Sequence, residues 1–500
     1  MVLLARGGKI KKPKIALVIA PVWDTDLPPI APAYLTASLQ KEGFNADIID
    51  FNVRLKEKKA LRKKIMEWSQ YVHGYNFFLG LVFPEYLTIE ENNFTREIEG
   101  LVRQWAGEIL DSGYNVIGFT IYNSSALLSL LLARRIKQES EKTLIVFGGP
   151  DCARWMRGDF FIRTGFVDAV VLGEGEATIV ELTDSVDGGE GFDAVPGSVI
   201  NRRGEIIYGR DRPLIKDLDT IPFPTFDRLP IASYGNETIF PILTSRGCTM
   251  NCSFCNEQVY WNKYRERSPI NVFNEFKYQK ERHGVFHFRT NDSLINGNVK
   301  RLGKICDLII ENELEVYWGG YARTGGMTPE LLAKMYEAGC RYLLYGIDSA
   351  SQPVIDRMNK RTKIEDMQKV LEWTKKAGIL VHTCWITGFP TERQEDFEAS
   401  VKFIKENANL IDSFVVVPCR IKESIDLYNN PEDYNLVIDK VEIDVPEPLA
   451  DMVKYLPTLS ENWRSNEVTN EERKRRTKVL TDLARDLIGE GSYYRGMPFE

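Results

Sequence analysis

The chain has 500 residues, more than the roughly 100–200 residues that one domain usually holds. Hydrophobic residues make up 43% and charged residues 27%, a globular composition that excludes a disordered or fibrous protein. The 64 Lys and Arg residues against 71 Asp and Glu give a net charge of −7. This balance excludes an overall basic field, so we expect several folded domains and no nucleic-acid partner.

Nothing in the sequence predicts a membrane span, because no apolar run approaches the ~18 residues that cross a bilayer. The basic start of the chain precedes apolar residues 15–20 and resembles a signal peptide superficially. The apolar run is too short, however, and residues 21–24 are not a small-residue cleavage site. We therefore expect a first strand there and a cytoplasmic protein.

The first 195 residues alternate short apolar runs with stretches of helical periodicity. Strands are expected at residues 15–22, 46–51, 116–122, 144–148 and 169–172, and helices at 32–42, 125–138 and 176–185. Apolar strands alternating with helices predict a doubly wound, Rossmann-like parallel sheet whose ligand lies beyond the carboxyl ends of the strands. An aromatic-rich insertion at residues 54–110 is too long for a loop and is predicted to be helical.

Prolines and glycines then mark a hairpin and linker at residues 196–238. A second series follows, with strands expected at residues 239–244, 284–289, 315–319, 342–346, 381–387 and 413–418, and helices at 329–338, 364–377 and 394–407. Six such units predict a partial (β/α)6 barrel over residues 239–420 with its chemistry at the carboxyl mouth. Residues 421–500 are expected to form a small, mainly helical region, in which Thr469 and Glu472 suggest a capping box and the charged run 471–478 a solvated helix face.

Three of the eight cysteines, Cys248, Cys252 and Cys255, lie within eight positions directly after the first barrel strand. Thiolates bind iron–sulfur clusters, and three of them would leave one iron of a [4Fe-4S] cluster open to chelate a small molecule. The alternatives are a zinc site or three unpaired thiols. Zinc in a structural site needs four ligands, and no His or Cys follows at finger spacing, so the cluster is the favoured interpretation.

The spacing C-x-x-x-C-x-x-C after the first strand of a βα series resembles the radical S-adenosylmethionine (radical SAM) superfamily. Further segments resemble that family in order, including residues 291–292, 346–351 and 388–392. The resemblance implies S-adenosylmethionine contacts from Phe254, Asp292, Arg323, Asp348, Ser349 and Gly388. Two segments depart from the family: Asp348 replaces the common Glu, and Asn291-Asp292 replaces Gly-Glu. An Asp at the end of a strand, such as Asp348, could alternatively be the N-cap residue of the following helix.

An α/β domain before such a barrel resembles the cobalamin-dependent subgroup. The matching stretches are residues 28–35, 148–150 and 168–176. The resemblance implies cobalamin contacts from Pro29, Ser124, Gly148, Gly149, Gly173, Glu174 and Gly175. Glycines at strand ends allow close approach of a ligand, although ordinary turns in an α/β fold also use them.

The distribution of histidines bears on the cobalt ligand. The chain has four His residues, and the loop after the first strand, residues 21–27, contains none. We therefore expect base-off cobalamin without a protein His ligand. His73 in the aromatic insertion is the alternative ligand, although a surface or partly buried His is the simpler interpretation.

The resemblance implies a cobalamin-dependent radical SAM methyltransferase. A 5′-deoxyadenosyl radical would abstract hydrogen from an unactivated carbon, which would then take a methyl group from methylcobalamin. Cyclisation, rearrangement or oxidation with the same cofactors is the alternative, and a non-catalytic electron carrier would ligate every iron itself. The implied partners are an external electron donor such as flavodoxin or ferredoxin and a substrate that is a small molecule or a peptide or protein side chain. Residues 54–110 and 421–500 carry no motif and are expected to select that substrate.

Overall fold

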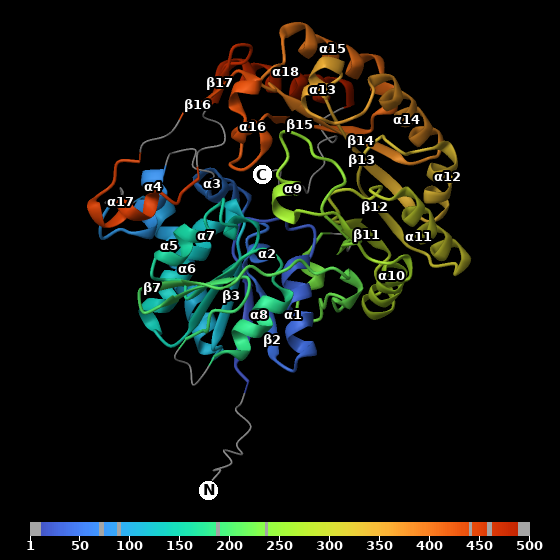
Figure 1. The fold of residues 1–500 in the computed structure, drawn as a ribbon. Coiled ribbons are helices and arrows are strands. Elements are labelled where there is room, and N and C mark those ends of the chain that lie inside the picture. Colours follow the sequence, from blue (N-terminus) through green and yellow to red (C-terminus); the bar gives the residue numbers. More distant parts are fainter. Residues whose placement is uncertain are drawn as a thin grey trace.

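The computed structural model describes residues 12–69, 75–87, 92–186, 191–235, 239–439, 443–457 and 463–488. It contains two α/β domains, each built on its own sheet, and a C-terminal region that touches both (Figure 1). The helix α9 (Glu257–Trp261) lies between the two domains (Figure 1). No helix of the described residues combines the length and apolar character that crossing a bilayer requires.

The first domain has a seven-stranded sheet in the order β2-β1-β3-β4-β5-β6-β7. Its strands are β1 (Lys14–Ile19), β2 (Asn45–Asp50), β3 (Val116–Thr120), β4 (Leu144–Gly148), β5 (Ala169–Val171), β6 (Ser198–Arg202) and β7 (Glu205–Tyr208). The first five are parallel, as the sequence predicted. The hairpin β6–β7 pairs antiparallel with β5, so the first sheet continues past the predicted boundary at residue 195 into the segment expected to be a linker.

Both faces of this sheet are covered, as the continuous apolar strands predicted. In β1, Ile15 and Leu17 enter the core beneath α1 and α8, while Ala16 and Val18 enter the core beneath α5 and α6. Alternate side chains of a strand point to opposite faces, so a strand buried on both faces needs no polar residue. The helices are α1 (Ile30–Lys41), α2 (Phe51–Arg54), α3 (Lys59–Ser69), α4 (Tyr75–Val82), α5 (Asn93–Asp111), α6 (Ala126–Glu139), α7 (Gly158–Arg163) and α8 (Glu176–Asp184).

The insertion at residues 54–110 is helical in its described parts, where α3, α4 and α5 form one wall of the domain. Asn92 begins α5 and accepts a hydrogen bond from the Thr95 amide at 3.1 Å, which satisfies a free amide of the first turn. Trp105 of α5 stacks on Phe51 with ring centroids 4.7 Å apart. The aromatic content of the insertion therefore forms core. His73 lies outside the described residues.

The second domain is an open sheet of six parallel strands, β15-β14-β13-β12-β11-β8, in which each strand lies beside its predecessor. The strands are β8 (Ile239–Ile242), β11 (His287–Thr290), β12 (Tyr317–Ala322), β13 (Cys340–Asp348), β14 (Leu380–Thr387) and β15 (Ser413–Pro418). The connecting helices are α10 (Pro269–His283), α11 (Val299–Glu311), α12 (Pro329–Glu337), α13 (Gln352–Arg357), α14 (Ile364–Lys376) and α15 (Gln394–Glu406). This agrees with the predicted partial barrel. The strand expected from residue 284 begins later, because Gly284 ends α10 with a left-handed φ of 66°.

The C-terminal region contacts both domains. It contains α16 (Asp426–Asn429), α17 (Glu447–Val453), α18 (Asn470–Ile488) and a small ribbon of β16 (Leu436–Ile438) with β17 (Trp463–Ser465). Helix α17 packs against α7 of the first domain, whereas α18 packs against β15 at the edge of the barrel (Figure 1). The charged run 471–478 was expected to be a solvated helix face, but Arg473 and Arg476 within it are buried under the barrel edge. Glu472 accepts a hydrogen bond from Arg476.

Candidate active site between two sheet edges

The carboxyl ends of the two sheets border one cavity of about 390 Å³. The loops after β1 and β3 line it from the first domain, and the ends of β11 and β12 line it from the second. The chain after Cys255 completes the wall with Asn256, Glu257 and Tyr260. In a sheet of order 2-1-3-4-5, the loops after the first and third strands diverge and form the ligand crevice. The cavity lies at this point.

The three predicted cluster cysteines lie on one loop between β9 (Ser245–Arg246) and α9. The loop is held from two sides. Gln258 donates a hydrogen bond to the Met250 carbonyl at 2.8 Å, and the Ser253 amide donates to the Met358 carbonyl at 3.1 Å. The Leu427 amide donates to the Ser253 carbonyl at 3.1 Å, which ties the C-terminal region to the loop. The loop is thus preorganised by its surroundings.

All three thiols are free of disulfides and partly exposed, and they act electrostatically on one another. Burial raises the pKa of Cys252 to about 11 and that of Cys255 to about 12, and burial also raises the pKa of Cys248. Without a metal they are therefore neutral at physiological pH. Cluster binding, which takes thiolates, would release their protons.

A cluster fits this loop better than a single ion does. Within the described ranges, no three His, Cys, Asp or Glu side chains converge on a point where one metal ion could bind. In a four-iron cluster each thiolate ligates a different iron, so the sulfur atoms surround the cluster without meeting at one point. The zinc alternative would need such convergence.

Arg323, predicted to contact S-adenosylmethionine, lies beside the cysteine loop after β12. Its guanidinium bonds to the Met250 sulfur and, at 3.3 Å, to the Arg361 carbonyl. Its charge lowers the pKa of Cys248 and Cys252, although burial outweighs that effect. A cation at this place is suited to the carboxylate of a ligand bound next to the cysteines.

Asp348 ends β13 with a left-handed φ of 64° and pairs with Lys360, a residue that the sequence analysis did not single out. Lys360 also donates to the Gly346 carbonyl at 2.6 Å. The pair influences the Cys252 thiol, which places it at the cluster loop. The alternative of a helix cap is wrong, because Ser351 is the residue that begins α13.

The remaining predicted S-adenosylmethionine contacts differ in accessibility. Phe254 is half-buried against the barrel core. Asp292 lines the cavity, but its carboxylate accepts bonds from the Thr244 amide at 2.6 Å and from the Ser245 hydroxyl at 2.7 Å. Ser349 is fully buried, and its hydroxyl accepts from the Ser351 amide at 3.2 Å. Asp292 and Ser349 therefore fix the strand ends on which the site is built.

Gly388 follows β14 with a φ of 68° and packs against α18. A Cβ atom there would lie 2.3 Å from the Arg473 side chain, so the turn needs glycine for both conformation and space. Its amide donates to the Glu392 carboxylate at 2.7 Å, and Glu392 is paired with Arg476 at 2.9 Å. The C-terminal helix therefore holds this turn.

The residues predicted to contact cobalamin gather at the carboxyl edge of the first sheet. Pro29 lines the cavity and precedes α1. The Ser124 hydroxyl donates to the Val22 carbonyl at 2.6 Å and so shapes the loop after β1. Gly149 has a φ of 111°, and a Cβ there would lie 2.7 Å from the Ile121 carbonyl oxygen. Gly148, Gly173 and Gly175 stand at the ends of β4 and β5, where Gly173 has open space around it.

Glu174 has a role that the sequence did not indicate. Its carboxylate lies between Arg246 at 2.6 Å and Arg265 at 2.8 Å, and it also accepts from the Ile215 amide at 2.8 Å. Arg246 bonds Glu176 as well. Because Arg246 stands two residues before Cys248, these buried pairs join the predicted cobalamin loop directly to the cluster loop. Sequence distance concealed the contact, since about 70 residues separate the partners.

A second charged contact crosses the cavity and was also missed. Asp24 in the loop after β1 lies 3.5 Å from Arg289 of β11, and burial raises the pKa of Asp24. Arg62 of α3 donates to the Trp23 carbonyl at 2.6 Å, so the insertion anchors this loop. Trp23 stacks on Tyr122 with ring centroids 3.7 Å apart. The cavity thus has an aromatic wall and one buried charge pair.

Comparison with known proteins agrees with this geometry. The model of the radical SAM superfamily matches residues 242–404, the segment that holds the cysteine loop. An uncharacterised methyltransferase of Pyrococcus horikoshii is 28% identical over 337 residues, which cover 66% of this chain and 73% of that protein. An anaerobic magnesium-protoporphyrin IX monomethyl ester cyclase of Rubrivivax gelatinosus is 29% identical over 354 residues, covering 68% of this chain and 61% of that protein.

Among solved structures, the radical S-adenosylmethionine methyltransferase TsrM from Kitasatospora setae, with cobalamin and a [4Fe-4S] cluster bound, aligns with a TM-score of 0.67. The alignment covers 97% of this chain and 93% of that chain at 16% identity, which shows a shared fold. Residues 242–404 therefore form a radical SAM domain, and the chain shares its overall fold with TsrM and with the cobalamin-dependent S-adenosylmethionine radical enzyme OxsB.

Proposed function

We propose that this protein is a cobalamin-dependent radical SAM methyltransferase that methylates an unactivated carbon of a small molecule or of a peptide or protein side chain. The observation that carries the proposal is the cavity that lies between the two sheets. Residues directly after the cysteine loop line it on one side, and the switch point of the first sheet lines it on the other. Asp292 of the expected S-adenosylmethionine site and Pro29 of the expected cobalamin site both line this cavity, which supports it as the place where a substrate would lie.

When bound, the cluster with S-adenosylmethionine would supply a 5′-deoxyadenosyl radical, and cobalamin would supply the methyl group. The chain's residues then hold and orient these groups. Cys248, Cys252 and Cys255 are the proposed iron ligands, and Arg323 and Asp348 the proposed S-adenosylmethionine contacts. The stacked Trp23 and Tyr122 cover the first-sheet side of the cavity and would exclude water from a radical.

The names of the relatives support methylation and also one alternative. TsrM is described as a methyltransferase with cobalamin and a [4Fe-4S] cluster bound, and several relatives carry methyltransferase names. Relatives named as magnesium-protoporphyrin IX monomethyl ester cyclases favour a second candidate, a cyclisation or oxidation with the same cofactors. Each outcome also takes electrons from an external donor, of the flavodoxin or ferredoxin kind.

The proposed cobalamin is base-off and lacks a protein His ligand. The three histidines of the described chain, His283, His287 and His382, lie near the amino ends of barrel strands, away from the carboxyl edge. The side chains that line the cavity in the described structure include no histidine. In cobalamin-loaded protein, the electron paramagnetic resonance spectrum of Co(II) should show no nitrogen splitting from protein. A single-nitrogen splitting that His73→Ala removes would contradict this assignment.

The cluster is tested by replacing Cys248, Cys252 and Cys255 with Ala together. The variant should lose the cluster chromophore and all 5′-deoxyadenosine formation, because too few thiolates remain to hold the irons. Cys306→Ala, a change at a buried core thiol on α11, is the matched control and should keep both. Persistence of either signal in the triple variant would refute the proposal. A product heavier by one methyl group separates methylation from cyclisation.

A further inference from the structure

The cysteine loop rests on a short turn, residues 357–363, which we call the basic turn. Its sequence Arg-Met-Asn-Lys-Arg-Thr-Lys contains four cations and no acid, in a chain whose net charge is −7. The turn begins at the last residue of α13 and includes two residues with left-handed backbone, Asn359 at φ 54° and Arg361 at φ 51°.

Direct hydrogen bonds join the basic turn to the cysteine loop. The Asn359 side chain donates to the Asn251 carbonyl at 2.7 Å, and the Ser253 hydroxyl donates to the Arg357 carbonyl at 3.2 Å. The Arg361 carbonyl accepts from Arg323, whose charge acts on Cys248 and Cys252. The basic turn is therefore in direct contact with the loop that carries the three thiols.

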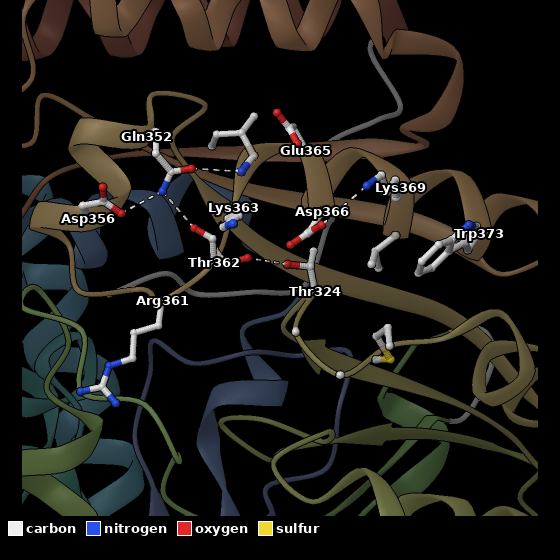
Figure 2. Close-up of a pocket in the computed structure, with 15 residues that line it drawn as sticks. Thr324, Gln352, Asp356, Arg361, Thr362, Lys363, Glu365, Asp366, Lys369 and Trp373 are labelled. Carbon is white, nitrogen blue, oxygen red and sulfur yellow. Dashed lines mark hydrogen bonds and ion pairs between the residues drawn. The ribbon is translucent and has the colours of Figure 1, made fainter.

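The cations of the turn divide into two kinds. Lys360 points inward to Asp348, and Arg357 bonds the Asp433 carbonyl, so both are engaged within the chain. Arg361 and Lys363 are exposed, and the Asn251 residue of the cysteine loop is exposed beside them. In Figure 2 the Arg361 guanidinium points away from the other labelled side chains of the adjoining cleft. These two cations are available to a partner.

Acidic neighbours do not cancel this surface. Asp366 lies 3.8 Å from the cation of Lys369, whereas the exposed Asp356 keeps its charge, because its hydrogen-bond partner Gln352 is neutral. Glu365 stands on the opposite side of the cleft from Arg361 (Figure 2). Arg357, Arg361 and Lys363 are three exposed cations beside the one carboxylate of Asp356, so the basic turn is positive on balance.

We propose that the basic turn, with the exposed edge of the cysteine loop, is the docking surface for a small acidic one-electron carrier. The inference rests on the proposed function, which takes an electron from outside. The carrier would pass one electron to the cluster, lowering the cluster charge by one while the carrier is oxidised by one electron, with no proton moved. Charge complementarity speeds such an encounter, and interfaces of this kind are small and weak.

The test compares two donors on the full chain with its cluster assembled. A purified flavodoxin, fully reduced, is the protein donor, and dithionite is the small donor that needs no docking. The variant Arg361→Glu with Lys363→Glu should reduce its cluster about tenfold or more slowly with flavodoxin at low ionic strength. Its rate with dithionite should equal that of the wild type. The matched control, Lys402→Glu with Lys405→Glu on α15, reverses two exposed cations elsewhere and should keep the flavodoxin rate.

Salt provides a second measurement. The flavodoxin rate of the wild type should fall as ionic strength rises, whereas that of the reversed variant should change little, and Arg361→Gln with Lys363→Gln should lie between them. An unchanged flavodoxin rate in the reversed variant, with normal reduction by dithionite, would overturn the docking surface alone. A wild-type chain that dithionite cannot reduce would overturn the proposed function and this inference with it.

Discussion

Asp348 at the end of β13 shows how one side chain can belong to both the fold and the site. Its backbone is left-handed, and its carboxylate pairs with Lys360 while both side chains are largely buried. A buried pair is costly to break on one side, because the remaining charge has no partner. The same carboxylate lies near Cys252, where the bound S-adenosylmethionine is expected. A single substitution would therefore mix two effects.

Two variants separate these effects. Asp348→Asn alone should lower the free energy of unfolding by about 3 kcal/mol, since it leaves Lys360 buried and unpaired. Adding Lys360→Met should restore most of that stability. If Asp348 also contacts S-adenosylmethionine, the double variant should still bind it about tenfold more weakly, a loss of roughly 1.4 kcal/mol. Wild-type affinity in the stable double variant, measured by calorimetry, would assign Asp348 to the fold only.

Asp50 gives a prediction about pH. Its carboxylate caps α2 and accepts from the Tyr234 hydroxyl at 2.5 Å, and burial raises its pKa from 3.8 to about 6. The folded state therefore binds the proton more tightly than the unfolded state. The contribution of the protonated Asp50 carboxyl group to the free energy of unfolding is complete below pH 4. It is lost as the pH rises through 6, by as much as about 3 kcal/mol.

Asp50→Asn cannot ionise, so it should flatten this dependence. Melting temperatures at pH 5 and pH 7.5 are the measurement, and Asp47→Asn, a half-buried carboxylate on the same strand, is the control. The control should keep the slope of the wild type. An equal slope in Asp50→Asn would show that Asp50 is not the group responsible.

At the scale of elements, α18 holds the turn after β14. Arg473 lies over the Trp463 ring at 3.7 Å and passes next to Gly388, while Arg476 pairs with Glu392. The turn that faces the expected cofactor is therefore fixed by a helix about 80 residues later in the chain. Its position depends on arginines that pack as core residues do, with their alkyl stems buried.

Gly388→Ala should disturb this contact. The new methyl group would overlap the Arg473 side chain, and alanine would have to adopt a left-handed backbone conformation. We therefore expect the free energy of unfolding to fall by about 2 kcal/mol or more. Faster proteolysis within α18 should accompany a lower melting temperature. Gly303→Ala, in the interior of α11 with open space around it, is the control and should stabilise by about 0.5–1 kcal/mol. Similar behaviour of the two variants would contradict the proposed packing.

The helices and strands were the features of this protein that the sequence predicted best. Strand and helix periodicity identified the parallel strands of both sheets, because strands such as β1, β3 and β4 carry apolar runs that are buried on both faces. Partners distant in the chain gave no local signal. Glu174 appeared as part of a cobalamin loop and proved to pair with Arg246, and Arg476 appeared solvated and proved to be buried. A run of charged residues in a sequence does not show which of its side chains are buried, because burial depends on tertiary contacts.

At the scale of the whole molecule, buried ion pairs between Glu174, Arg246 and Arg265 join the two domains. Domain interfaces within a chain are usually polar and permit relative motion. Here the charges are almost fully buried, so the pairs fix the first sheet against the cysteine loop. The separation between the two expected cofactor sites is consequently set by these side chains.

Glu174→Gln should loosen the domains, because two arginines would remain buried beside a neutral amide. Calorimetry should show one unfolding transition in the wild type and two in the variant, with the first at least several degrees lower. Glu181→Gln on α8, the helix that follows Glu174, is the control, since its pair with Arg212 lies at the surface and should contribute less than about 1 kcal/mol. A single, unshifted transition in Glu174→Gln would argue against this coupling.

The placement of α17 and α18 has a consequence for how the protein folds during its synthesis on the ribosome. Leu449 of α17 completes the core of the first domain, and Leu480 of α18 completes that of the barrel. Domains usually fold one after another as they emerge during synthesis. In this chain neither core is closed until residues beyond 440 have been translated. Both domains should therefore wait for the same late segment, and nascent chains arrested before it should bind chaperones.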